Sequence, residues 1–406
     1  MRRSASCTAQ GGQMPNVSDW AEAVPMSGVR EIFHMIAGRD DILHLEIGQP
    51  DFPTPSHIVE AAVESARVGS GYTASAGMPS LREAIQDKLA SVNGVEVSTD
   101  QIIITQGGVQ GCAALLSTVV KPGGEVLIPD PTWPNFEMLV RLHGATPVHY
   151  PLDPSASWLP NVRQVESLIT DRTELIILNT PANPTGSLFP DAMIYEFIAM
   201  AKLHDVPILS DEVYDELIFD GLKPANAFAR DDEHVVALYS FSKTYSMTGW
   251  RVGYVVAPEW LAPTLSRIQE PLVSCISTVT QAAAEAAIRG PQEVVGMMRD
   301  TYQKRRDVAI DILASGGFQV DPPAGGFYLM VPLEEGADSK QAAFNLIDHG
   351  VALSPGTAYS KAATNYLRIS LASSDYDLTH GMERVVEWLK ASNGGLEMVS
   401  AGSLTT

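Results

Sequence analysis

The chain has 406 residues, 45% of them hydrophobic and 18% charged, and its 27 Lys and Arg against 48 Asp and Glu give a net charge of −21. This apolar content excludes disorder over most of the chain, and the acidic balance argues against a nucleic-acid partner, because affinity for phosphate backbones comes from clustered Lys and Arg. The three cysteines are odd in number and far apart, which excludes a readable disulfide framework and indicates a reducing compartment.

The two ends of the chain carry little pattern. Residues 1–18 and 392–406 are polar or weakly patterned, which predicts a mobile tail at each end. The N-terminus lacks the apolar segment of a signal peptide, and no apolar run reaches the roughly 18 residues of a membrane helix. We therefore expect a cytoplasmic protein with no membrane partner.

Residues 55–290 alternate between helical periodicity and short apolar runs. Helical spacing of apolar residues is seen at 58–66, and a helix-like segment at 191–204. The short apolar runs lie at 102–104, 126–128, 175–178, 207–209, 235–238 and 252–256. Runs that are apolar on both faces are typical of a mainly parallel sheet covered by helices on each side. The sequence therefore predicts an α/β fold, with a large domain over 55–290.

Residues 291–391 follow a different pattern. Helical stretches are predicted at 297–313, 340–347 and 375–389, and strand-like runs at 327–331 and 366–371. This mixture predicts a smaller α+β domain, and we expect the segment 19–54 to return to it.

A lysine with polar neighbours follows one of the predicted strands, at the edge where ligands bind in an open α/β sheet. Ser240-Phe241-Ser242-Lys243 comes after the run 235–238, and Arg251 stands eight residues beyond the lysine. A lone lysine is usually solvated surface, so its neighbours matter. A lysine amine can form a Schiff base with a cofactor aldehyde, while hydroxyls, arginine and backbone N–H groups can hold a phosphate.

Two further motifs follow neighbouring predicted strands. Asp211 comes directly after the run 207–209, and an Asn-Pro-Thr-Gly turn at 183–186 follows the run 175–178. Taken singly, such an aspartate is more often a helix cap or half of an ion pair, and such a turn is only a turn. Beside a Schiff-base lysine, however, a carboxylate can keep a pyridinium nitrogen protonated. The combination indicates chemistry on a phosphorylated pyridine aldehyde.

An ordered set of motifs carries a resemblance to a known family. The set consists of Ile47-Gly48-Gln49-Pro50-Asp51-Phe52, Tyr72 with Gly77-Met78-Pro79-Ser80-Leu81-Arg82, Trp133-Pro134-Asn135, Asn183-Pro184-Thr185-Gly186, Asp211-Glu212-Val213-Tyr214, Ser240-Phe241-Ser242-Lys243, Gly249-Trp250-Arg251-Val252-Gly253-Tyr254 and Arg368-Ile369-Ser370. Each motif is weak alone, but the ordered set is specific. From about Asp19 to Leu389 the chain resembles the fold-type I pyridoxal-5′-phosphate (PLP) aminotransferases of class I/II, the aspartate aminotransferase superfamily.

The resemblance implies a ping-pong transfer of an amino group from an α-amino acid to an α-keto acid. Lys243 resembles the Schiff-base lysine, which afterwards moves a proton between the substrate Cα and the cofactor. Asp211 is implied to pair with the pyridinium nitrogen, so that the ring accepts electrons. Asn183 and Tyr214 are implied to donate to the ring's 3′ oxygen, and thereby to lower the pKa of the Schiff-base nitrogen.

The remaining cofactor contacts are implied in the same way. Trp133 resembles the aromatic residue that stacks on the ring. The implied phosphate cradle consists of Gly107, Gly108, Val109, Ser240, Ser242 and Arg251, where a helix N-terminus favours an anion. Tyr72 resembles a tyrosine that reaches the phosphate of the neighbouring subunit, which implies a homodimer with a shared active site.

Substrate contacts complete the implied site. Arg368 resembles the arginine that holds the substrate α-carboxylate in a bidentate fork, and Gly48 resembles a loop glycine beside the substrate, where Asn183 also lies. The chain departs from the family at Val109, where some bacterial members that use aspartate carry a lysine. This departure argues against a dicarboxylic substrate and favours a neutral or aromatic side chain, with Phe136, Phe327, Tyr359 and Tyr72 as candidates to line its pocket.

Other functions remain as alternatives. A β-eliminating lyase, a cyclase or an oxidase of the same fold begins by removing the same proton, and the lysine does not separate them from a transaminase. Ser240 and Lys243 also match the Ser-x-x-Lys pattern of serine hydrolases, but neither Ser-Asp-Asn nor Lys-Thr-Gly follows. A PLP-sensing regulator needs a basic DNA-binding segment that the chain does not show. The nine histidines have no metal-ligand spacing, so no metal is predicted.

Overall fold

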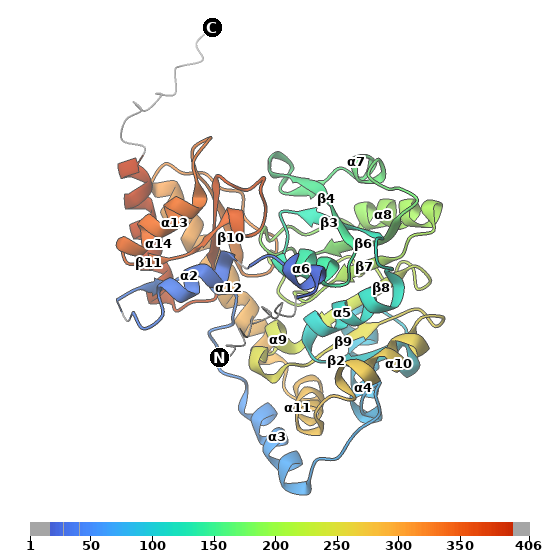
Figure 1. The fold of residues 1–406 in the computed structure, drawn as a ribbon. Coiled ribbons are helices and arrows are strands. Elements are labelled where there is room, and N and C mark those ends of the chain that lie inside the picture. The colour runs from blue at the N-terminus through green and yellow to red at the C-terminus, as the bar shows by residue number, and fades with distance from the viewer. Residues whose placement is uncertain (1–16, 27, 40, 393–406) are drawn as a thin grey trace, which may run out of the picture.

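A computed structural model describes residues 17–26, 28–39 and 41–392, so the predicted tails at 1–18 and 392–406 lie almost wholly outside the described residues. An eight-stranded sheet forms the centre of the larger part of the molecule, in the order β2-β9-β8-β7-β6-β3-β4-β5 (Figure 1). Its strands are β2 (Ile102–Thr105), β3 (Glu125–Asp130), β4 (Thr146–Asp153), β5 (Leu159–Pro160), β6 (Thr173–Asn179), β7 (Ile208–Asp211), β8 (Val235–Ser240) and β9 (Gly253–Val256).

The pairing of these strands confirms a mainly parallel sheet. Neighbouring strands from β8 to β4 pair in parallel. The exceptions are β9, which is antiparallel to both β2 and β8, and β5, which is antiparallel to β4. Because these five parallel strands end at one edge, the residues that follow them gather there.

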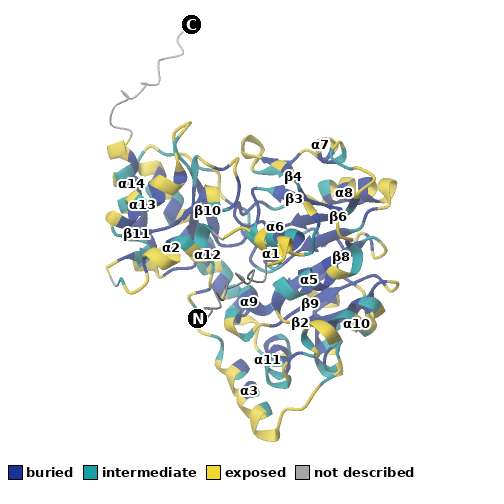
Figure 2. Cartoon of the chain, viewed as in Figure 1, coloured by how far each residue is buried: buried dark blue, intermediate teal, exposed yellow. Residues whose placement is uncertain are grey.

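Helices cover both faces of this sheet. They are α3 (Ser56–Val68), α4 (Pro79–Lys88), α5 (Gly107–Val119), α6 (Pro134–Leu142), α7 (Val162–Glu166), α8 (Asp191–His204), α9 (Phe241–Thr244), α10 (Ala262–Val273) and α11 (Thr278–Arg289). Successive strand residues point to opposite faces: Ile102 and Ile104 pack in one buried cluster with α3, α4, α8 and α11, and Ile103 packs in another with α5, α6 and α10. Figure 2 shows the strands buried and the outer helix surfaces exposed.

The second part of the molecule is built from both ends of the described chain. Its elements are α2 (Gly28–Met35), β1 (Leu43–His44), α12 (Glu293–Ser315), β10 (Tyr328–Pro332), α13 (Ser339–Asp348), β11 (Val351–Ala352), β12 (Ser354–Pro355), β13 (Tyr366–Ser370) and α14 (Asp375–Ser392). The short helix α1 (Asp19–Glu22) packs instead against α6 of the sheet domain. β10, β13 and β12 form an antiparallel sheet, and β1 pairs in parallel with β11.

A third buried cluster joins these elements. Ile32, Ile36 and Leu45 from the N-terminal segment pack there with residues of α12, α13 and α14. Helix α2 contacts β12 and is joined to α13 by an ion pair of 2.9 Å between Glu31 and Lys340. From this packing we propose two domains. The smaller one consists of residues 19–54 together with 291–391, and the larger one of residues 55–290. Short turns of 3₁₀ or π helix lie at Leu89–Asn93, Thr99–Gln101, Pro154–Ala156, Thr248–Trp250 and Gly356–Ala358. In the part of the chain that is described, no helix combines the length and apolarity needed to cross a bilayer.

Candidate active site

A cavity of about 410 Å³ lies at the carboxyl ends of β6, β7 and β8, against the start of α5 and the strand β13. Most residues predicted for the site line it. These are Gly48, Gly108, Val109, Trp133, Asn183, Asp211, Tyr214, Ser240, Ser242, Lys243, Arg251 and Arg368. Two predicted residues, Gly107 and Tyr72, do not line the cavity of their own chain.

Lys243 enters the cavity from α9, a short helix that begins directly after β8. The Oγ atom of Ser240 accepts a hydrogen bond of 3.2 Å from the backbone N–H of Ser242 and so caps this helix. The Nζ atom of Lys243 donates to the carbonyl oxygen of Gly48 at 2.5 Å. Burial, together with the charges of Arg368 and Arg251, lowers the pKa of Lys243 to about 8. The neutral amine, which is the nucleophilic form, is therefore accessible near neutral pH.

Asp211 is the last residue of β7 and is buried. Its Oδ1 atom accepts a hydrogen bond of 3.3 Å from the backbone N–H of Val213. Burial raises the pKa of Asp211 to about 7, with a further contribution from Glu212, and the charge of Lys243 offsets only part of this rise. A cation placed beside a buried carboxylate stabilises its ionised form. A protonated ring nitrogen is such a cation.

The phosphate cradle depends on a glycine. α5 begins at Gly107, whose φ is +73°, and a Cβ atom at this position would lie 2.6 Å from Nη2 of Arg251. Because Gly107 has no side chain, the Arg251 guanidinium can approach the first turn of the helix. Arg251 is held in turn by a 2.8 Å bond from Nη1 to the carbonyl oxygen of Thr248. A helix N-terminus next to an arginine is a site for an anion such as a phosphate.

Arg368 is a buried guanidinium that lies between two aromatic rings. Its Cζ atom is 4.2 Å from the ring centroid of Tyr328 and 4.7 Å from that of Tyr359. Nη1 donates to Oδ1 of Asn183 at 3.1 Å, and Nη2 donates to the carbonyl oxygen of Glu46 at 2.5 Å. Within the described residues its Nε atom is buried without a partner, and no carboxylate pairs with it. A buried cation of this kind is completed by an anionic ligand.

Tyr214 and Asn183 lie between these charged groups. The hydroxyl of Tyr214 donates to the hydroxyl of Tyr328 at 3.1 Å, and burial raises the pKa of Tyr214 well above its usual value, so the phenol stays neutral and able to donate. The backbone N–H of Asn183 donates to Oδ1 of Asn179 at 2.8 Å. These contacts fix both side chains near the ends of β6 and β7.

The structure corrects two of the four residues predicted for the side-chain pocket. Tyr359 lines the cavity, but Phe136 is fully buried beneath Trp133, edge to face at 5.3 Å between ring centroids. Phe327 is also fully buried, in the third cluster, and does not line the cavity. Its ring lies beneath the lysine, with its centroid 5.4 Å from Lys243 Nζ. Tyr72 is 96% exposed and lies outside the cavity of its own chain.

Several residues of the cavity were not predicted. Among them are Arg30, Ile47, Gln49, Asn179 and Tyr328. Tyr328 has the clearest role, because it contacts Arg368 and Tyr214, and a Cβ atom on Gly48 would lie 1.8 Å from its hydroxyl. The sequence contains one indication of this role. Tyr328 stands beside Phe327 in a strand-like run, and because neighbouring strand residues face opposite sides, the two could not both face the same way.

The residues present fit pyridoxal phosphate on three counts. A buried lysine with a lowered pKa can take an aldehyde, a buried carboxylate with a raised pKa can take a pyridinium, and the Gly107–Arg251 cradle can take a phosphate. When bound, the cofactor supplies an electron sink for the pair of electrons left at Cα.

Comparison with known proteins also leads to a family that uses pyridoxal phosphate. Residues 40–385 match the family described as aminotransferase class I and II. The chain is 35% identical to an aspartate aminotransferase of Pyrococcus abyssi, and equally to an aromatic-amino-acid aminotransferase of Thermococcus litoralis, in each case over 92% of this chain and 98% of the relative. Among solved structures, a mutant aspartate aminotransferase of Thermus thermophilus superposes with a TM-score of 0.87 at 31% identity, over 93% of this chain and all of that one.

The family match covers most of the chain, including every motif from Gly48 to Arg368 and all residues that line the cavity except Val29 and Arg30. The chain therefore belongs to the class I and II aminotransferases, enzymes of fold type I that use pyridoxal phosphate to move an amino group.

Proposed function

We propose that this aminotransferase works through Lys243, with Asp211 and Arg368 as the two groups that place cofactor and substrate around it. The observation that carries the proposal is the pairing of Lys243, a lysine of lowered pKa, with Arg368, a buried arginine that has no carboxylate partner among the described residues, in one cavity. An α-amino acid brings a carboxylate to the arginine and its Cα proton towards the lysine.

In this proposal the tasks are divided among five side chains. Arg368 binds the α-carboxylate, and because amino acids and keto acids share that group, one site serves both half-reactions of a ping-pong cycle. Lys243 binds the cofactor aldehyde and then, as a neutral amine, takes the Cα proton and returns it. Asp211 keeps the ring nitrogen protonated, while Tyr214 and Asn183 donate to the ring oxygen.

Replacing Lys243 by Ala tests the central step. We expect the variant to fold and to bind PLP weakly, with turnover lower by about 10⁴-fold or more, because both the covalent attachment and the general base are lost. Borohydride reduction of the native enzyme followed by peptide mapping should give a pyridoxyl group on the peptide that contains Lys243. Near-normal turnover in the variant, or a label elsewhere in the chain, would contradict the proposal.

We propose an amino donor with a neutral or aromatic side chain. Val109 gives the start of α5 no cation for a distal carboxylate, and Trp133, Tyr328 and Tyr359 line the cavity with aromatic rings. The test is a screen of alanine, phenylalanine, tyrosine and aspartate as donors, with 2-oxoglutarate and pyruvate as acceptors. The proposal fails if aspartate has much the highest kcat/KM.

We also propose a cytoplasmic homodimer in which Tyr72 completes the partner's site. Tyr72 is 96% exposed, and Val59, Val63 and Val68 on the neighbouring helix α3 are exposed as well. Large apolar side chains gathered on one surface are typical of a protein interface. Light scattering gives the mass in solution, and Tyr72→Phe should weaken PLP binding without changing that mass. A monomer that binds PLP normally would rule the shared site out.

A further inference from the structure

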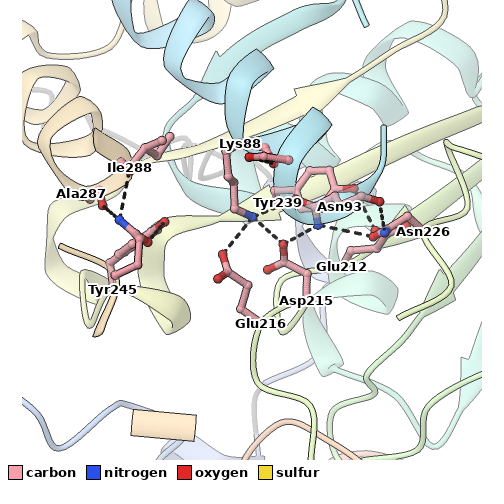
Figure 3. A network of polar contacts seen from close by, with 12 residues as sticks. Lys88, Asn93, Glu212, Asp215, Glu216, Asn226, Tyr239, Tyr245, Ala287 and Ile288 are labelled. Atoms are coloured by element: carbon pink, nitrogen blue, oxygen red, sulfur yellow. Dashed lines mark hydrogen bonds and ion pairs between the residues drawn. The ribbon is translucent and has the colours of Figure 1, made fainter. Parts of the chain in front are cut away.

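The turn that carries Tyr214 presents side chains to two different surroundings. Asp211 and Tyr214 line the catalytic cavity. Glu212 and Asp215, which lie between and beyond them in the chain, are equally buried but do not line it. They point to a polar cluster inside the large sheet domain, shown in Figure 3. Whatever holds these two carboxylates therefore also sets the position of the turn.

Lys88 is the cation of this cluster. It is the last residue of α4, and its side chain is only 8% exposed. Figure 3 shows its Nζ atom pointing between two carboxylates, with Asp215 Oδ2 at 2.7 Å and Glu216 Oε1 at 3.1 Å. A third contact of 3.2 Å goes to Oδ1 of Asn93. Both carboxylates belong to the residues that directly follow Tyr214.

Further bonds make the cluster rigid. Nδ2 of Asn93 donates to Asp215 Oδ2 at 2.9 Å, and Asn93 is hydrogen-bonded to Asn226. Glu212 accepts from the hydroxyl of Tyr239 at 2.9 Å and from the backbone N–H of Ala227 at 3.0 Å. The turn is thus held at Glu212, before Tyr214, and at Asp215, after it.

The cluster also borders the helix that carries the Schiff-base lysine. A small cavity of about 10 Å³ is lined by Lys88, Asp215, Thr244 and Tyr254, and Thr244 directly follows Lys243. The hydroxyl groups of Thr244 and Tyr254 are buried there and have no hydrogen-bond partner among the described residues. Lys88 therefore lies where the Tyr214 turn and α9 approach each other.

The buried carboxylates around Lys88 need its positive charge. Burial by itself would lower the pKa of Lys88, but the negative charges beside it, above all that of Asp215, outweigh burial and raise this pKa, so the group stays a cation. Removing one partner of a buried ion pair leaves a charge without compensation, which is more disruptive than replacing the whole pair. Without the lysine, Asp215 and Glu216 would have to take up protons, admit water or move, and the turn would move with them.

We propose that Lys88 is a positioning residue of the amino-transfer site: it clamps Asp215 and Glu216 from outside the catalytic cavity and thereby fixes the hydroxyl of Tyr214 against the cofactor's ring oxygen. This inference rests on the proposed role of Tyr214.

The test is the pKa read from the visible absorbance of bound PLP. A Tyr214 hydroxyl held against the ring oxygen stabilises its ionised form and so lowers the pKa of the Lys243 nitrogen. We expect Lys88→Met to raise this pKa by about half a unit or more, in the same direction as Tyr214→Phe. In the double variant the effect of Lys88→Met should disappear, because the hydroxyl that it displaces is already absent. Lys88→Arg, which keeps the charge, should restore part of the native value.

Lys202→Met is the matched control. Lys202 pairs with the buried carboxylate of Asp231 in the same part of the molecule, but neither residue belongs to the turn that carries Tyr214, so this variant should lose stability and leave the absorbance pKa unchanged. If Lys88→Met does not accumulate as folded protein, Asp215→Asn tests the same clamp and should raise the pKa by a smaller amount. An unchanged pKa in a folded variant, or an equal shift in the Tyr214→Phe background, overturns the inference. If Tyr214→Phe itself leaves the pKa unchanged, the proposed role of Tyr214 fails instead.

Discussion

Arg368 is a buried cation without a carboxylate partner among the described residues, and we propose that the substrate supplies one. Tyrosine rings on both sides and the bonds to Asn183 and Glu46 hold the guanidinium in place before any substrate arrives. A group that is already oriented loses less entropy on binding than a flexible one. If Arg368 binds the α-carboxylate as proposed, the structure orients it for that group before the substrate arrives.

Replacing Arg368 by Gln should lower kcat/KM by about 10²-fold for every amino donor, because two charge-assisted hydrogen bonds of about 1.5 kcal/mol each are lost. Steady-state kinetics with two donors checks this. Arg39→Gln, which removes an exposed arginine paired with Asp41, is the control and should leave the kinetics unchanged. A loss confined to one donor would show that Arg368 contacts the side chain and not the α-carboxylate.

The lowered pKa of Lys243 predicts how cofactor uptake depends on pH. A lysine whose pKa falls from its usual value to about 8 becomes nucleophilic as the pH rises through that value. The rate of PLP uptake by the apoenzyme should therefore rise about tenfold per pH unit between pH 6 and 7, and level off above about pH 8. Stopped-flow absorbance measures this rate. A rate that continues to rise up to pH 10 would contradict the lowered pKa.

At the level of single elements, the apolar runs predicted strands well. The runs at 102–104, 126–128 and 175–178 lie in β2, β3 and β6, because a segment without polar side chains is stable only where both faces are covered. β4 was not predicted, since Pro147 and Pro151 interrupt it and its burial alternates towards the edge of the sheet. The two-residue strands β11 and β12 carry no periodicity that a sequence could reveal.

The candidate site likewise contains some residues that the sequence reveals and others that only the folded structure reveals. Asp211, Asn183 and Lys243 could be predicted because each follows a strand whose end the sequence marks. Tyr328 could not, because its place under Arg368 results from the pairing of β10 with β13, two strands far apart in the chain. Phe136 and Phe327 were assigned to the pocket although they are core residues, because the direction of an aromatic side chain depends on its neighbours in space.

Gly107 is the residue on which the start of α5 depends. Gly107→Ala would force a Cβ atom into a left-handed backbone conformation, φ +73°, and to within 2.6 Å of the Arg251 guanidinium. We expect PLP affinity to fall about tenfold, with a loss of unfolding free energy of about 1 kcal/mol. Gly123→Ala is the matched control, because its φ is +86° with nothing nearby for a Cβ to meet. Equal PLP affinities in the two variants would refute a role for the cradle.

For the whole molecule, the buried carboxylates make stability depend on pH. The pKa values of Asp211 and Glu212 are both raised to about 7, mainly by burial. A carboxyl group with a raised folded-state pKa binds a proton more tightly in the folded state, so its contribution to stability is lost as the pH rises through that value. The unfolding midpoint of the apoenzyme should therefore fall by several degrees between pH 5.5 and 7.5, as differential scanning fluorimetry would show. Asp211→Asn should reduce this fall, and a midpoint that rises over the same interval would contradict the prediction.

The N-terminal segment packs against the C-terminal part of the chain, and this affects folding during translation. β1 pairs with β11, and the carbonyl of Glu46 accepts from Arg368, so residues 43–46 find their permanent neighbours near the C-terminal end of the described chain. On the ribosome, this segment emerges early and must wait until some 300 further residues have been translated, at about 5–20 residues per second. Its apolar side chains remain uncovered throughout that interval, so chaperone demand should be concentrated at this stage of synthesis, and prematurely terminated chains should aggregate.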